Sequence, residues 1–146
     1  MPSKAEIRVD FIPPECLAEA WPLVEPWIAK GARTANETTS DILGDIRAGR
    51  AQLWMIGDAG DICVSGALVT AIRPLDEGHY VGMYALSGKQ VWRWAHLLHA
   101  TIYEFAMKNG CNAVRFYGRR AWARFFPDCK IIGDRNGHAL FERAIP

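Results

Sequence analysis

The sequence lacks the features that mark several large classes of protein. None of its 4 cysteines stands in a Cys-x-x-Cys pair, which argues against a zinc ribbon and a dithiol redox motif. It has no leader pattern and no apolar run long enough to span a bilayer, so we expect no membrane contact, a cytoplasmic location and no disulfide. Without repeats or low-complexity segments, its 146 residues predict a single domain over 1–146.

An excess of charge of either sign is also missing. The chain carries 17 basic and 16 acidic residues, so no overall field attracts nucleic acid or an anionic membrane, and we expect neither partner. The basic residues do gather locally, at Arg115, Arg119, Arg120 and Arg124. This cluster is either a solvated helix start or a local nucleic-acid contact, and the neutral overall charge disfavours the second interpretation.

Helical periodicity is present in three segments. Apolar residues recur at spacings of three and four after Glu15, where Pro22 and Pro26 should kink or shorten the helix. A second, short helix is expected over 38–48, and a long one begins near Val91 and ends at Gly110. The polar, small segment 31–37 between the first two is typical of a mobile loop over a site.

The remaining apolar runs predict strands. Their ranges are 7–12, 52–56, 62–73, 78–86, 113–117, 131–132 and 138–145, with the second, third and fourth forming an antiparallel meander joined by turn residues at 57–61 and 74–77. The run 78–86 has no purely polar side, with Val81, Met83 and Ala85 expected on one face, so it should be central. A short helix over 119–126 precedes the final hairpin, whose Asn136-Gly137 pair suits a tight turn. Cys63 and Cys111 lie in apolar runs and should be buried.

This order of elements, together with the residues at one strand-to-helix junction, resembles the GNAT superfamily of acyl-CoA-dependent N-acetyltransferases. The junction is the run from Tyr80 to Leu86 followed by Ser87-Gly88-Lys89-Gln90 at the start of the long helix. The resemblance covers nearly the whole chain and implies an α/β (α+β) fold with a mixed, mainly antiparallel sheet flanked by helices. A narrower likeness, in Gly118 to Trp122, is to small GNAT-like proteins encoded by tailed phages and prophages.

The resemblance implies acetyl-CoA as co-substrate and assigns residues to it. Helix N-termini bind phosphate through unpaired backbone N–H groups, which gives Ser87, Gly88, Lys89 and Gln90 to the pyrophosphate. In the family the preceding strand splays from its neighbour and pairs with the pantetheine arm as an added strand would. Here that role would fall to the backbone of three residues, Met83, Tyr84 and Ala85.

Three positions depart from the family pattern. Only Gly88 agrees with the usual phosphate-loop spacing, because Ala85 and Gln90 fill its outer positions. Where the family frequently carries a tyrosine acid, after Ala121, this sequence has Phe125, whose ring has no proton to give.

Direct attack of an amine on a thioester needs a group that takes the ammonium proton and a group near the leaving sulfur that gives one. Glu77 and His79, before the central strand, are the candidates for the first role, and Tyr117, at the end of its strand, for the second. Each also has an ordinary structural interpretation, as turn, surface or packed aromatic residue. His96 and His99 stand three apart, but no nearby carboxylate at helical spacing completes a metal site, so we expect no metal.

The sequence supports two principal functions. The first is acetyl transfer from acetyl-CoA to a primary amine by direct attack in a ternary complex, with an unidentified acceptor. The second is a catalytically degenerate GNAT-like protein that binds or assembles, for instance in a phage virion or in takeover of a host, with a protein partner or a second copy as its ligand. The six tryptophans, Trp92 and Trp94 beside the junction among them, suit either an adenine or a partner surface.

Overall fold

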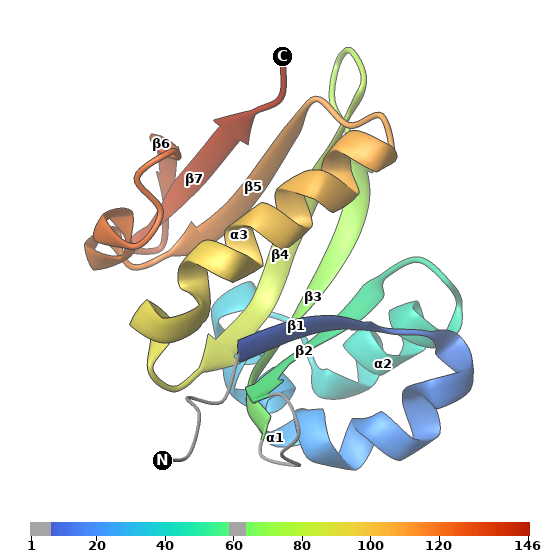
Figure 1. Ribbon diagram of the computed structural model, residues 1–146. Helices are drawn as coiled ribbons and strands as arrows, with labels where there is room; N and C mark the ends of the chain where they lie inside the picture. The colour runs from blue at the N-terminus through green and yellow to red at the C-terminus, as the bar shows by residue number, and fades with distance from the viewer. Residues whose placement is uncertain (1–6, 59–63) are drawn as a thin grey trace.

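The computed structural model describes residues 7–58 and 64–146, which form a mixed sheet with helices on both faces (Figure 1). The strands of this part are β1 (Ile7–Ile12), β2 (Gln52–Asp58), β3 (Val64–Pro74), β4 (His79–Gly88), β5 (Ala113–Gly118), β6 (Lys130–Arg135) and β7 (His138–Ala144). Their order across the described sheet is β1-β2-β3-β4-β5-β7-β6. The β4–β5 pair is parallel and the others are antiparallel, so the predicted fold class, the meander and the central place of β4 are confirmed.

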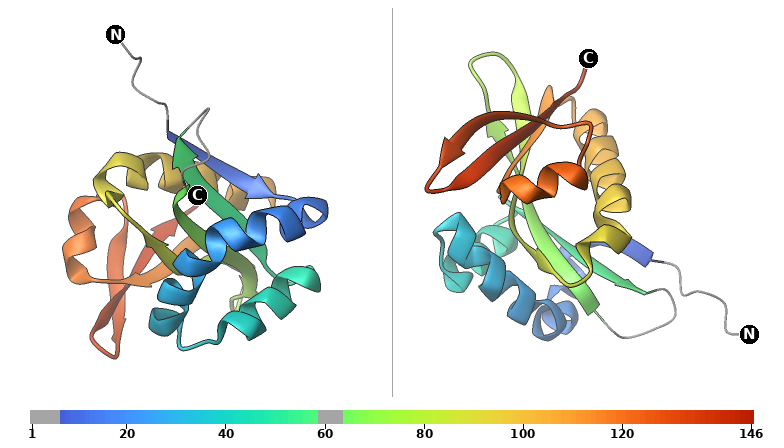
Figure 2. Two further views of the ribbon diagram at one scale, coloured as in Figure 1. Left: turned by 90° about the horizontal axis from the view of Figure 1, so that it is seen from below. Right: turned by 90° about the vertical axis from the view of Figure 1, so that its left-hand side faces the viewer.

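Helices α1 (Leu17–Ala35) and α2 (Thr39–Arg47) cover one face of the sheet, and α3 (Val91–Lys108) covers the other. The right-hand view of Figure 2 shows the sheet between them. Two short 3₁₀ helices, η1 (Pro14–Cys16) and η2 (Arg120–Arg124), complete the described elements. No helix in the described ranges has the length and apolar character needed to cross a membrane.

Each face of the sheet has its own apolar core. On the α3 side, the side chains of Trp94, Leu98 and Ile102 pack against Val81 and Met83 of β4. On the α1 side, Val24 and Ile28 pack in a separate cluster with residues of α2, β2 and β3. The alternation of side chains along each strand therefore divides the molecule into two layers with different contents.

Helix α1 runs without a break through both of its prolines, so of the two predicted effects, a kink or a shorter helix, the shortening is wrong. Pro22 and Pro26 are four residues apart and exposed, whereas Val24 and Ile28 are fully buried. Each proline leaves one backbone carbonyl without its helical donor. Because both prolines lie on the solvent side of the helix, water can satisfy those carbonyls while the apolar stripe holds the helix on the sheet.

The segment 31–37 is mostly helix rather than a loop. Helix α1 continues to Ala35 and ends at Asn36, which adopts a left-handed conformation with φ of 57°. Gly31 is buried against β4, where a Cβ atom would stand 2.3 Å from the backbone carbonyl of Ala85. The small residues of this segment thus permit close packing of a helix on a strand. Their small size and polarity predict a loop instead.

Several local predictions are confirmed. The hydroxyl of Thr38 accepts a hydrogen bond from the Asp41 backbone N–H at 3.0 Å and caps α2. Asn136 and Gly137 both have positive φ in the turn between β6 and β7. Cys111 is buried as expected, whereas the predicted turn at 59–61, the strand start at 62–63 and the burial of Cys63 fall outside the described residues.

The predicted basic cluster is partly neutralised. The Arg115 Nε donates to Glu142 at 2.7 Å, and Arg120 pairs with Asp134 at 3.2 Å. Arg124 lies over the ring of Phe125. The two carboxylates reduce the local field that a nucleic acid would need.

Two helical glycines provide a matched test of this packing. Gly31→Ala should lower the free energy of unfolding by about 2 kcal/mol or more, because its methyl group meets the Ala85 backbone. Gly44→Ala, in α2, meets nothing within 4 Å and should raise stability by up to about 1 kcal/mol through helix propensity. Urea denaturation of the two variants measures both values, and equal effects would contradict the close contact.

Candidate functional site

Strands β4 and β5 are paired over only part of their length and then diverge. They pair from Tyr80–Ala113 to Met83–Phe116 and no further. Beyond that point β4 stays paired with β3 as far as Gly88, and β5 stays paired with β7 (Figure 1). We call the wedge beyond the Met83–Phe116 pair the β4–β5 opening. Its two edges present backbone groups that an extended ligand can pair with, as an added strand would.

A β-bulge in β4 stands at the opening. Tyr84 pairs with Val69 and Ser87 with Ala67, so Ala85 and Leu86 together face Leu68 alone. Ala85 adopts a left-handed conformation with φ of 52°, which is uncommon for alanine. A bulge bends its strand and increases the local twist, which is consistent with the departure of β4 from β5 at this point.

The bulge also changes which way the side chains point, and this corrects the predicted face of Ala85. Ala85 packs in the α1-side core, whereas Val81 and Met83 belong to the α3-side core. One extra residue in a strand moves every following side chain to the opposite face. Leu86 accordingly packs with the α3 side.

The predicted loop over Ser87 to Gln90 is shorter than expected, because Ser87 and Gly88 belong to β4. A Cβ atom on Gly88 would stand 2.7 Å from the Ser65 carbonyl oxygen and 2.8 Å from the Trp94 ring. Glycine is therefore required there by packing against β3 and α3. Substitution of Gly88 would disturb the fold as well as any bound phosphate.

The N-terminus of α3 lies at the end of β4 with unused donors. The Lys89 backbone N–H bonds to the Ser65 carbonyl at 2.9 Å, and its own carbonyl accepts from the Trp94 indole at 2.8 Å. No acceptor for the backbone N–H groups of Gln90, Val91 or Trp92 occurs among the described residues. These donors and the exposed Lys89 ammonium provide the chemistry of an anion site.

The two tryptophans at this end differ in exposure. Trp94 is 1% exposed and fixed by its bond to Lys89, so it is a core residue and not a stacking surface. Trp92 is 69% exposed and lies on the first turn of α3 beside the free N–H groups. Of the pair, Trp92 alone is placed to stack on a planar ligand.

Two tyrosines flank the mouth of the opening. Tyr84 and Tyr117 directly follow the last β4–β5 pair and, by strand alternation, project from the sheet face that carries α1. Burial, reinforced by the charge of Glu37, raises the pKa of Tyr84 to about 12, so its phenol keeps its proton at neutral pH. Tyr117 is more exposed, and the Arg135 guanidinium lies over its ring at 5.7 Å.

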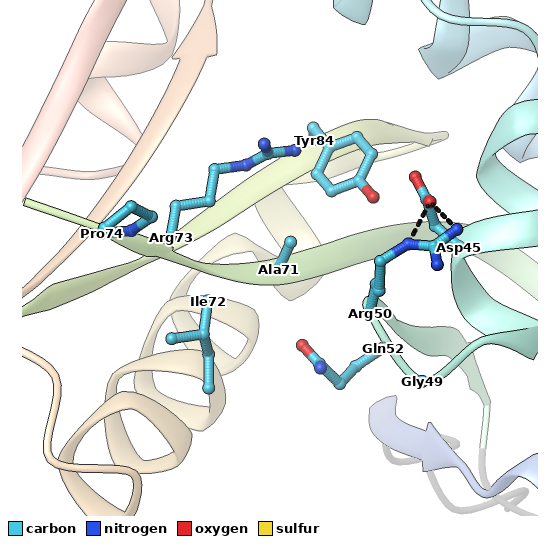
Figure 3. A pocket seen from close by; sticks show the side chains of 9 residues that line it. All are labelled: Asp45, Gly49, Arg50, Gln52, Ala71, Ile72, Arg73, Pro74 and Tyr84. Carbon is cyan, nitrogen blue, oxygen red and sulfur yellow. Dashed lines mark hydrogen bonds and ion pairs between the residues drawn. The ribbon is translucent and has the colours of Figure 1, made fainter.

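A cleft of about 520 Å³ extends from Tyr84 toward α2. Figure 3 shows Arg73 and Tyr84 on neighbouring strands at one side and the Asp45–Arg50 ion pair, 2.9 Å long, at the other. The lining of this Tyr84 cleft comprises Asp45, Gly49, Arg50, Gln52, Ala71, Ile72, Arg73, Pro74 and Tyr84. It is large enough for a small molecule and shares one wall, Tyr84, with the β4–β5 opening.

Glu37 is the residue of this region that the sequence did not single out. It follows the α1 cap, and its Oε2 atom is buried without a hydrogen-bond partner among the described residues. Burial raises the pKa of its carboxyl; Arg73 opposes the shift, and Asp45 and Asp41 add to it. The sequence holds one indication of its role: Glu37 is the last residue of the segment 31–37, which is predicted to lie over a site.

The structure does not bring the predicted catalytic residues together. Glu77 lies in the exposed turn between β3 and β4, and His79 is the exposed first residue of β4. His79 and Tyr84 are five positions apart, about 17 Å along a strand. Tyr117 stands at the opposite, open end of the β4–β5 pair.

The two histidines considered for a metal have separate surroundings. His99 is buried, and its Nε2 lies 3.6 Å from the Sγ of Cys129, whereas His96 is exposed. Burial lowers the pKa of His99 to about 4 and raises that of Cys129 to about 11, so both groups are neutral. Over the described ranges no cluster of metal-binding side chains forms.

Comparison with known proteins gives agreement in structure only. No family model matches the sequence, and no curated protein matches it. Solved structures do match. PaiA N-acetyltransferase from Thermoplasma acidophilum, in complex with coenzyme A, has a TM-score of 0.62 at 10% identity, over 96% of this chain and 99% of that one.

Two further structures agree. A GNAT-family acetyltransferase from Staphylococcus aureus has a TM-score of 0.62 at 11% identity, covering 94% of this chain and 98% of its own. IAA acetyltransferase from Bacillus cereus has a TM-score of 0.61 at 9% identity, covering 96% and 100%. The chain has the GNAT fold, as its sequence predicted.

The environment of Glu37 makes a prediction about pH. Since its pKa is raised in the folded state, the stability linked to its protonated form is full below the ordinary value of 4.5 and is lost as pH rises through the folded value. Glu37→Gln, which mimics the protonated form, should therefore melt at a higher temperature than the wild type at neutral pH. The difference should vanish below that ordinary value.

Glu25→Gln, at an exposed position of α1, serves as the control and should melt with the wild type at every pH. Thermal unfolding followed by circular dichroism measures all three proteins. A Glu37→Gln variant less stable than the wild type at neutral pH would show that the carboxylate has a structural partner.

Proposed function

We propose that this protein is an N-acetyltransferase that transfers the acetyl group of acetyl-CoA to a primary amine in a ternary complex. The observation that carries the proposal is the β4–β5 opening, which leads from two tyrosines to the free N–H groups of α3. Such an opening suits a long ligand with an amide-containing arm and an anionic end. The similarity to acetyltransferases of known structure supports it through the fold.

The residues at the opening fit acetyl-CoA. The backbone of Tyr84 and Ala85 would pair with the amides of the pantetheine arm, with Met83 as the last residue committed to β5. The N–H groups at the start of α3 and the Lys89 ammonium would hold the pyrophosphate. The exposed Trp92 ring is available to the adenine.

When bound, acetyl-CoA supplies a thioester whose carbon forms a bond to the amine nitrogen as its bond to sulfur breaks. The amine gives up one proton, and the departing sulfur takes one. We assign the second proton to Tyr117, which stands at the mouth of the opening. Glu77 and His79 could act on the first proton only through an acceptor that reaches the far end of β4, whereas Glu37 lies close enough to Tyr84 to raise its pKa.

A non-catalytic role in binding or assembly, in a phage virion for example, is the second candidate. Phe125, which has no proton to give, favours it. The exposed apolar residues Trp92, Ile131 and Ile132 also suit a partner surface. This role requires neither cofactor binding nor the tyrosines at the mouth.

Isothermal titration of acetyl-CoA into the protein tests the proposal. We expect micromolar binding, weakened about tenfold by Lys89→Glu, because a carboxylate at the start of α3 repels the phosphates. Lys30→Glu, an identical charge reversal at an exposed position of α1, should bind as the wild type does. No heat from the wild type at millimolar cofactor would overturn the proposal in favour of the binding role.

A further inference from the structure

Two charged groups of opposite sign have no partner among the described residues in this region: Arg73, which lines the Tyr84 cleft, and Glu37, which lies outside its lining. The guanidinium of Arg73 lies over the Tyr84 ring at 5.5 Å, and no carboxylate of the described residues lies within salt-bridge distance of it. By contrast, Arg50 in the same cleft is neutralised by Asp45 at 2.9 Å. Arg73 therefore remains available to an anion that enters the cleft.

Glu37 supplies the complementary charge. Its buried Oε2 has no donor among the described residues, and a buried acceptor left without a donor costs stability. An ammonium group carries three N–H donors and a positive charge, so it satisfies this oxygen better than a neutral ligand does. Glu37 is thus suited to a cationic amine.

The two groups lie near one another without forming an ion pair. Arg73 lies over the Tyr84 ring in the cleft lining, and the charge of Glu37, from outside that lining, acts on Tyr84, Arg73 and Asp45, which all line the cleft. Arg73 also acts on the carboxyl of Glu37, yet the pair does not approach within 4.0 Å. A ligand with an amine and an anionic group can be placed between them.

We propose that the Tyr84 cleft binds a small primary amine that also carries a carboxylate or a phosphate, with Glu37 holding the ammonium group and Arg73 the anion. The proposal rests on the acetyl-transfer function, for which this ligand is the acceptor. The cleft volume of about 520 Å³ suits a ligand of this class, and Tyr84 separates it from the opening assigned to the thioester. Glu37 then also takes the proton that the amine releases before attack.

Binding can be tested without acetyl-CoA, by NMR titration of four matched compounds. β-Alanine and O-phosphoethanolamine carry an amine with a carboxylate or a phosphate, ethanolamine carries the amine with no anion, and propionate carries the anion with no amine. The wild type should bind at least one of the first two about tenfold more tightly than either of the others. Which of the two binds better distinguishes carboxylate from phosphate recognition.

Variants of Arg73 and Glu37 test which residue binds the anionic group and which binds the ammonium group. Arg73→Gln should abolish the preference for β-alanine or O-phosphoethanolamine over ethanolamine. Glu37→Gln should weaken the binding of the amines and leave propionate unchanged. Arg143→Gln is the matched control, because Arg143 stacks on a tyrosine in the same manner, 3.9 Å from the Tyr103 ring centroid of α3, and should bind all four compounds as the wild type does.

In the transfer assay, Arg73→Gln should raise KM about tenfold for the preferred acceptor and leave KM for ethanolamine unchanged. Glu37→Gln should lower kcat for every amine. Equal binding of ethanolamine and the two anionic amines by the wild type would overturn the proposal, as would a preference that survives Arg73→Gln. If acetyl-CoA fails to bind, the transfer function falls, while the NMR titrations still decide what the cleft recognises.

Discussion

The architecture depends on how β4 divides its backbone between two neighbours. It pairs with β3 along almost its whole length but with β5 for four residues, Tyr80 to Met83. The bulge at Ala85 ends that second pairing region, and Gly31 of α1 packs directly against the bulge. Without a side chain at Gly31, helix and strand approach closely enough to hold Ala85 in its uncommon conformation. The β4–β5 opening and α1 therefore meet at this one contact.

The two faces of the sheet differ in what covers them. The α3 side is closed by a continuous apolar cluster that contains Trp94 and the aromatic rings of Phe116, Phe126 and Phe141. On the other face, α1 packs on β4 and β3 with α2 beside it, and tyrosines of β4 and β5 lie under arginines. Stability comes mainly from the α3-side cluster and from the core beneath α1, and the arginine-covered tyrosines of β4 and β5 lie beside that second core on the same face.

Local chemistry predicted the elements well and the site less well. Hydrophobic periodicity located α3 and the strands, and the Thr38 cap and the Asn136-Gly137 turn followed from single residues. The errors arose where a distant segment decides the outcome. The helix continues to Ala35, where Gly31 permits its close packing on β4, and Ala85 changes face because of a bulge that no alternation pattern reveals. The burial of Glu37 and the charges that act on it come from side chains that the fold brings together, so the sequence could not show them.

The central claim, that the β4–β5 opening receives acetyl-CoA along its open edge, is tested most directly by amide hydrogen exchange with and without the cofactor. We expect slower exchange within Tyr84 to Leu86 and Gln90 to Trp92, and unchanged exchange in Tyr80 to Met83, whose β5 pairing is already complete. Binding of acetyl-CoA with no added protection in either of the first two segments would contradict it, because the cofactor would then lie elsewhere on the molecule.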